Sequence, residues 1–339
     1  MEGIAYQMND AELRSARKDF SRLGLGVFIM LAVTYGVQIM LALTQDFASV
    51  RSILNDPVLL LVISYVPMYC VGVPLCYAVV RRVQAERPQI RSLEKGQFFR
   101  SLIVCFFFMY GGNLFGTIVN SSISESLGLE IIDPVEALVT SGIPMPALFV
   151  LTVICAPVFE ELVFRRLLID RMSVYGQGYA VVISAMMFGL LHANLSQFFY
   201  AMALGLVFGS VYARTGRLRY SVFLHMIINF WGGIVSGMLV ADESVMAIAS
   251  GGFGMEDIGE LAGLVTPAVV LFVLYTLISL GLAIAGLVVF RRYRREMVLE
   301  PAERLFPRGT RFKTVWINVG MLLFAVVCIA LMVLTIYGF

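Results

Sequence analysis

The chain has 339 residues, of which 59% are hydrophobic and only 14% are charged, and its mean hydropathy is +0.86. Soluble globular domains average about 25% charged residues, so this composition excludes an ordinary soluble domain and indicates a membrane protein. The net charge of +2 is too small to indicate a nucleic-acid partner.

Nine apolar blocks along the chain are long enough to cross a bilayer, which takes about 20 mostly apolar residues. The first follows a polar leader, lacks a small-residue cleavage site and is too long for a signal peptide, so we expect it to be retained. Only helices and closed barrels satisfy the backbone in lipid. The sequence therefore predicts an all-α, polytopic transmembrane bundle of about nine spans, at 23–45, 57–80, 101–120, 146–169, 174–194, 197–213, 220–240, 263–290 and 314–337.

The basic residues predict the orientation of these spans. Of the 25 Lys and Arg residues, 22 lie before the first block or between alternate blocks, Arg165 and Arg166 lie near the end of block 146–169 that leads to the same side, and only Arg51 lies on the other side. Cytoplasmic loops carry the excess of Lys and Arg, so we expect the N-terminus inside and the C-terminus outside. The loops expected outside, at 121–142 and 241–262, are acidic. Membrane topology explains the basic loops without a nucleic-acid partner.

Block 146–169 is the one block that carries charged residues away from its ends. A charge at the membrane centre costs about 2.5–3.5 kcal/mol on the insertion scale. Glu161 and Arg165 are four residues apart, on one helix face and in the favourable order, so a structural ion pair accounts for them. Glu160 has Phe164 at the matching position and is turned about 100° away. An unpaired carboxylate in a membrane is a functional-site hypothesis.

Both histidines of the chain lie in later blocks. His192 ends block 174–194, one turn after Phe188. His225 lies in block 220–240 with Asn229 one turn later on the same face. Glu and His are frequent general acid–base residues, and His with Asn can donate hydrogen bonds to an oxyanion. A single histidine in an apolar helix is usually a core residue, but two histidines together with an unpaired glutamate predict a catalytic site.

The motifs E-E-x-x-x-R (Glu160, Glu161, Arg165), F-x-x-x-H (Phe188, His192) and H-x-x-x-N (His225, Asn229) occur in this order. Together they resemble the CPBP intramembrane proteases, which include the CAAX prenyl endopeptidase of the Ras-converting type and the bacterial Abi proteins. The resemblance covers about 90 residues strictly. It divides the chain into a cytoplasmic leader (1–22), N-terminal spans and loops (23–142), a CPBP-like catalytic core (143–240) and a C-terminal loop with further spans (241–339).

The resemblance implies a role for each motif residue. Glu160 would activate a water together with His192, and His225 with Asn229 would bind the oxyanion. Glu161, Arg165 and Phe188 would be supporting residues. A metal has been inferred for this family as well as excluded, and a zinc ion here would take Glu160, His192 and His225 as ligands. H-E-x-x-H is absent, and the five cysteines form no C-x-x-C pair, so we favour a reaction without a cofactor.

The predicted function is an intramembrane endopeptidase that hydrolyses a membrane-associated protein or peptide near the cytoplasmic half of the bilayer by glutamate-activated water. The expected location is the bacterial cytoplasmic membrane, where lipid surrounds a multi-pass protein. Two alternatives from other classes remain: a non-catalytic scaffold or immunity protein, and a transporter that uses the same polar residues as a proton relay. The sequence identifies neither the substrate nor the oligomeric state.

Overall fold

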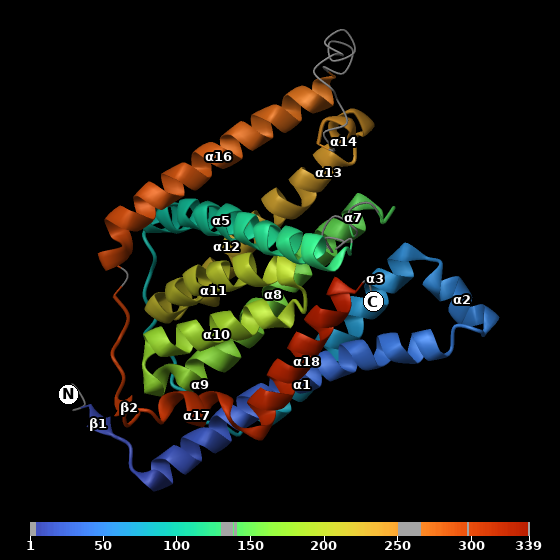
Figure 1. The fold of residues 1–339 in the computed structure, drawn as a ribbon. Helices are drawn as coiled ribbons and strands as arrows, with labels where there is room; N and C mark the ends of the chain where they lie inside the picture. Colours follow the sequence, from blue (N-terminus) through green and yellow to red (C-terminus); the bar gives the residue numbers. More distant parts are fainter. Residues whose placement is uncertain (1–4, 130–137, 139–140, 250–265, 297, 338–339) are drawn as a thin grey trace.

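The computed structural model describes residues 5–129, 138, 141–249, 266–296 and 298–337, and nearly all of them are helical (Figure 1). Two short strands, β1 (Tyr6–Gln7) and β2 (Arg304–Leu305), pair in parallel with Tyr6 opposite Arg304. The helices before the site are α1 (Asp10–Leu43), α2 (Ala48–Leu54), α3 (Pro57–Pro67), α4 (Val73–Val80) and α5 (Lys95–Leu127). Those that follow are α7 (Met145–Leu148), α8 (Ala156–Glu161), α9 (Asp170–Met172), α10 (Gln177–Leu191), α11 (Leu195–Thr215), α12 (Leu218–Asn229), α13 (Ser236–Val240), α14 (Glu243–Ala249), α16 (Pro267–Tyr293), α17 (Arg311–Trp316) and α18 (Val319–Ile336).

The predicted all-α polytopic membrane fold is confirmed. Within the described residues, eight helical stretches are long and apolar enough to cross a membrane: Asp10–Leu43, Pro57–Val80, Lys95–Leu127, Met145–Tyr175, Leu195–Thr215, Leu218–Val240, Pro267–Tyr293 and Val319–Ile336. The fifth of the nine expected spans, at 174–194, is instead the 15-residue helix α10. At 1.5 Å per residue it reaches only about 22 Å, less than the hydrocarbon thickness of about 30 Å. The α10–α11 hairpin therefore turns early, at His192 to Asn194.

The basic helix ends lie together at one end of the bundle, on the left in Figure 1. Contacts between distant segments fix this end. The Arg91 amide donates to the Thr215 carbonyl at 2.9 Å, and the Arg171 guanidinium donates to the Val80 carbonyl at 2.9 Å. Gln177 exchanges hydrogen bonds with Glu300. The segments that carry 24 of the 25 basic residues thus meet on one face, as the positive-inside pattern requires.

Several long helices are interrupted by π-helical turns, at Met68–Gly72, Phe149–Cys155, Leu162–Ile169 and Phe230–Val235. A proline removes one backbone donor, and Pro67 and Pro157 lie beside the first two of these turns. Two π turns enclose α8, which carries both glutamates, and the last begins directly after Asn229. Such turns are frequent at functional sites because they rotate the side chains that follow.

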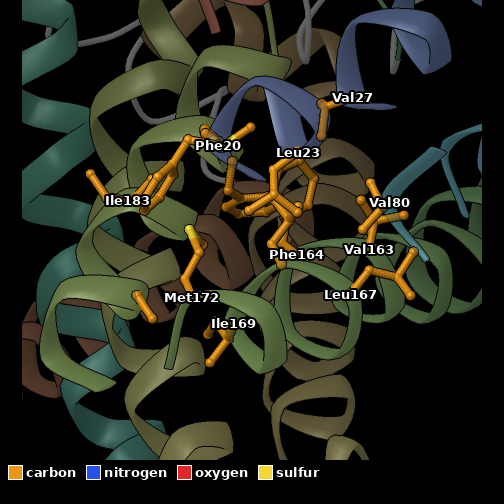
Figure 2. Close-up of a cluster of buried hydrophobic side chains, with 14 of the residues drawn as sticks. Phe20, Leu23, Val27, Val80, Val163, Phe164, Leu167, Ile169, Met172 and Ile183 are labelled. Atoms are coloured by element: carbon orange, nitrogen blue, oxygen red, sulfur yellow. The ribbon is translucent and has the colours of Figure 1, made fainter. Parts of the chain in front are cut away.

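The largest hydrophobic core lies beside the glutamates, towards the basic end. Phe20, Leu23 and Val27 of α1 pack there against Val163, Phe164 and Leu167 of the π turn Leu162–Ile169 (Figure 2). Helix α18 also packs closely against α1, at the point where Gly24 lies against Gly320. A Cβ atom on Gly24 would lie 2.5 Å from the Met321 backbone nitrogen, so only glycine permits this approach. The core therefore holds the glutamate-bearing helix rigidly in register.

The orientation of the spans is open to a direct test. Reporter fusions at Asp46, Arg91 and Asp257 are expected to report outside, inside and outside, because the basic segments share one end of the bundle. Asp257 lies outside the described residues. A cytoplasmic signal from the Asp257 fusion would contradict the expected orientation of the helices that carry the site.

Candidate active site

A cavity of about 450 Å³ lies within the helix bundle. Glu160, His192, His225 and Asn229, the four residues predicted to be catalytic, all line it. They come from three stretches of chain: α8, the end of α10, and α12. Tyrosines from four further segments also line it, namely Tyr65, Tyr110, Tyr200 and Tyr275. The structure thus brings together residues up to 69 positions apart, from Glu160 to Asn229.

Glu161 and Arg165 lie behind this cavity and have no solvent exposure. Arg165 donates to both carboxylate oxygens of Glu161, from Nε at 2.9 Å and from Nη2 at 3.1 Å. Its Nη1 donates to the Ser184 hydroxyl at 3.1 Å, and that hydroxyl donates to the Phe164 carbonyl at 2.7 Å. The guanidinium also lies over the Phe188 ring, 5.0 Å from its centroid. The ion pair expected from the four-residue spacing is therefore present, bidentate and fully buried.

His225 lies between the two glutamates. Its Nδ1 is 3.2 Å from Glu161 Oε1, and its Nε2 is 3.7 Å from Glu160 Oε2. Because a carboxylate only accepts, Nδ1 carries the proton that it donates to Glu161. The ring is stacked on Phe208 at 5.0 Å and meets the edge of Phe188 at 5.6 Å. Glu161 thus has a second partner besides Arg165, and Glu160 has a histidine nearby although no basic residue follows it by one turn.

His192 is held by its own helix end. Its Nδ1 lies 2.9 Å from the Phe188 carbonyl oxygen, which only accepts, so Nδ1 is the donor. In neutral His192 the other nitrogen, Nε2, is therefore an acceptor that is able to take a proton or orient a water. Phe188 supports both rings, because it contacts His192 edge-on at 5.0 Å as well as His225. The position of Phe188 one turn before His192 therefore allows one ring to contact both histidines.

Asn229 is anchored across the cavity. Its carboxamide nitrogen donates to the Thr152 carbonyl at 2.9 Å, within the π turn before α8. A carboxamide nitrogen has two N–H groups, so one remains for another acceptor. A regular α-helix would use the Thr152 carbonyl in its own backbone hydrogen bonds, whereas the π turn leaves this carbonyl able to accept from Asn229. The contact ties α12 to the helix that carries Glu160.

Glu160, His192 and His225 are the residues that would hold a metal ion here. Among the described residues, no three His, Cys, Asp or Glu side chains are grouped so that they would hold a metal ion. Both ring nitrogens of His225 face carboxylates of adjacent residues on one helix. No described group of such side chains thus indicates a zinc site, and a reaction without a metal stays a prediction.

Some residues of the site escaped the sequence analysis. Ser184 orients Arg165, Phe208 stacks on His225, and Thr152 accepts from Asn229. Ser184 is a polar residue in an otherwise apolar block, which is a weak signal. Thr152 acts through its backbone, so its side chain gave no indication. The cavity tyrosines lie on three helices outside the motif region and on α11, where aromatic residues are common in any membrane helix.

Comparisons with known proteins agree with the motifs. Residues 142–231 match the family model for the type II CAAX prenyl endopeptidase Rce1-like domain. Over 89 residues the chain is 30% identical to "Putative membrane peptidase YdiL" of Bacillus subtilis (strain 168). That alignment covers 25% of this chain and 35% of YdiL, so it spans about a third of the relative's length. No solved structure matches the chain. The helical core at 142–231, with its buried glutamate pair and both histidines, is thus similar to the type II CAAX prenyl endopeptidases.

Proposed function

We propose that the protein is an intramembrane endopeptidase in which Glu160 activates a water for attack on a peptide bond. The observation that carries this proposal is the placement of Glu160, His192, His225 and Asn229 on the wall of one cavity inside the membrane domain. The family of the core and the resemblance of residues 142–231 to a membrane peptidase support it. The substrate class is a peptide or protein segment that reaches the cavity from the lipid–water boundary.

The first step is deprotonation of water. Glu160, whose side chain is 13% exposed at the cavity wall, takes the proton, and the hydroxide attacks the scissile carbonyl carbon. His192 Nε2 accepts a hydrogen bond from the same water and orients it. Glu160 then passes the proton to the leaving amine, the C–N bond breaks, and an acid and an amine result. Each turnover consumes one water and regenerates the carboxylate.

The oxyanion that forms in this step requires hydrogen-bond donors. The second N–H of the Asn229 carboxamide supplies one. His225 donates to Glu161 through Nδ1, so it assists the oxyanion through Nε2–H when the ring is protonated on both nitrogens. Glu161 and Arg165 fix the ring in this position and do not touch the substrate.

Peptide cleavage by the purified protein tests the function, and Asn229 gives a sharp variant. Asn229→Asp keeps the side-chain shape but removes both N–H donors, and Asn229→Ala removes the whole group. Both variants are expected to lower kcat by about 10²–10³-fold, the usual effect of losing one oxyanion donor. The measurement is turnover of a quenched peptide library in detergent, with product ends identified by mass spectrometry. Wild-type kcat in the Asp variant would exclude Asn229 as an oxyanion donor.

The mechanism needs no metal. Using His225 as a ligand would remove it from the oxyanion, and losing such a donor costs about 2.7–4 kcal/mol. Active protein is therefore expected to contain well under one transition-metal ion per chain and to keep its activity after dialysis against a strong chelator. Elemental analysis and the cleavage assay, before and after dialysis, measure both. Stoichiometric zinc whose removal stops cleavage and whose return restores it would overturn the metal-free mechanism but not the protease function.

A further inference from the structure

The cavity occupies only one half of the bundle. The helix that runs from Met145 to Tyr175 contributes lining residues from Met145 as far as Glu160, and none of its basic half after Glu160 lines the cavity. The helix from Leu218 to Val240 contributes from His225 to its last residue. Along both helices the cavity starts at the catalytic residues and continues to the end opposite the basic residues.

The other helices follow the same rule. Helix α11 begins at the far end and ends at the basic end. It lines the cavity at Gln197, Tyr200, Ala201 and Leu204, which all lie in its first half. Helix α16 has the same direction and contributes Tyr275, eight residues after its start at Pro267. The lining also includes Leu138, in the segment before α7. The described wall thus extends towards the end of the bundle opposite the basic residues.

Towards the basic face, the described chain is densely packed. Glu161, Arg165, Phe164, Phe208 and Ile169 are fully buried directly beyond the catalytic residues. The hydrophobic core of Figure 2 continues this packing to α1 and α4. Further towards the basic end, Tyr212 donates to Asp170 at 2.6 Å, and Arg166 donates to the Tyr212 hydroxyl at 3.2 Å. Ion-paired and aromatic side chains therefore occupy the route that a substrate from the cytoplasm would need.

We infer that substrate and water enter the catalytic cavity from the acidic, non-cytoplasmic face of the membrane. The inference rests on the proposed function and on the positive-inside orientation. It replaces the expectation, drawn from the sequence, of a substrate near the cytoplasmic half of the bilayer.

The wall of the cavity also defines the substrate chemically. Besides Glu160 and the two histidines, the described lining residues are uncharged, and many are aromatic or aliphatic. A charged side chain entering such a wall would lose its hydration without finding a partner. The cavity therefore takes an uncharged, largely apolar peptide segment that emerges on the outer surface.

Gly233 is a position at which a substitution can test this route. It lines the cavity, and a Cβ atom there would meet no described atom within 4 Å. A large side chain at this position would project into space that the protein itself does not fill. Gly281 of α16 also has free space at its Cβ, but it is exposed and does not line the cavity. The two glycines form a matched pair.

The first experiment is thiol labelling from each side of the membrane. Ser236→Cys lies in the outer part of the cavity wall, and Gln84→Cys lies exposed at the basic face. A membrane-impermeant maleimide is added to right-side-out or inverted vesicles, and peptide mass mapping separates the new cysteines from the five native ones. Ser236→Cys is expected to react in right-side-out vesicles and Gln84→Cys in inverted ones. Labelling of Ser236→Cys from the same side as Gln84→Cys, or from neither side, would overturn the inference.

The second experiment uses turnover. Gly233→Trp is expected to lose cleavage of an apolar peptide while unfolding at the wild-type temperature, and Gly281→Trp to retain cleavage. A folded Gly233→Trp protein that cleaves like wild type would show that substrate does not use this route. If the wild type cleaves no peptide while the labelling pattern holds, the protease function fails and outward access stands.

Discussion

Glu160→Gln is expected to lower kcat for peptide cleavage by about 10²–10⁴-fold, the usual contribution of a positioned general base. The substitution keeps the length and hydrogen-bonding reach of the side chain but removes its ability to take a proton. Glu160 lies at the cavity wall, where its carboxylate oxygen Oε2 is 3.7 Å from His225 Nε2. The measurement is single-turnover cleavage of a quenched peptide by purified variant and wild type.

The control for this variant is its folding. Glutamine replaces a carboxylate that is 13% exposed in a polar cavity, so the thermal midpoint in detergent is expected to stay close to that of the wild type. If turnover persists at the wild-type rate, Glu160 is not the base. If the loss of turnover follows the loss of folded protein, the residue supports the structure and not the chemistry.

Much of this site could be predicted from the sequence, because local spacing carried the information. Glu161 and Arg165 pair as the four-residue spacing requires, and His225 lies one turn from Asn229 on the same cavity wall. The charged residues of block 146–169 were informative because the other blocks carry none away from their ends. A carboxylate in a hydrophobic helix must have a partner or a polar cavity, and Glu160 borders one.

The contacts between helices could not be predicted in this way. The hydrogen bond from His225 to Glu161 joins residues 64 positions apart, and it depends on how α12 crosses α8. The π turns before and after α8 have no clear hydropathy signal, although they set the carbonyl that Asn229 uses. Hydropathy also overestimated the block at 174–194, because the α-helix within it is limited to the 15 residues Gln177–Leu191.

The two adjacent glutamates have different tasks. Glu161 supports the site, and Glu160 is the proposed base. Glu161, Arg165 and Ser184 form a buried polar network that is satisfied internally, and its outer member is the His225 ring. Glu161, Arg165 and Ser184 fix the direction of the His225 ring, and these three residues do not line the cavity. Glu160 points into the cavity and is available for chemistry. One turn of helix thus supplies both the support and the proposed base.

Glu161→Gln is expected to destabilise the protein by about 3–5 kcal/mol, the typical cost of breaking one partner of a buried ion pair. The substitution leaves the Arg165 guanidinium charged and fully buried, and it also removes the acceptor for His225 Nδ1. Thermal and denaturant unfolding in detergent measure the loss. Glu160→Gln is the matched control, because it makes the same chemical change at the adjacent position and is expected to leave stability nearly unchanged.

A double-mutant cycle separates the ion pair from other effects of Glu161→Gln. Arg165→Gln alone strands a buried carboxylate and is expected to cost a similar amount, whereas the double variant leaves two neutral groups able to hydrogen-bond. The double variant should therefore be less destabilised than the sum of the single variants, with a coupling energy of about 0.5–3 kcal/mol. Additive losses, or a Glu161→Gln protein as stable as the Glu160→Gln protein, would mean that the pair does not act as the support of His225.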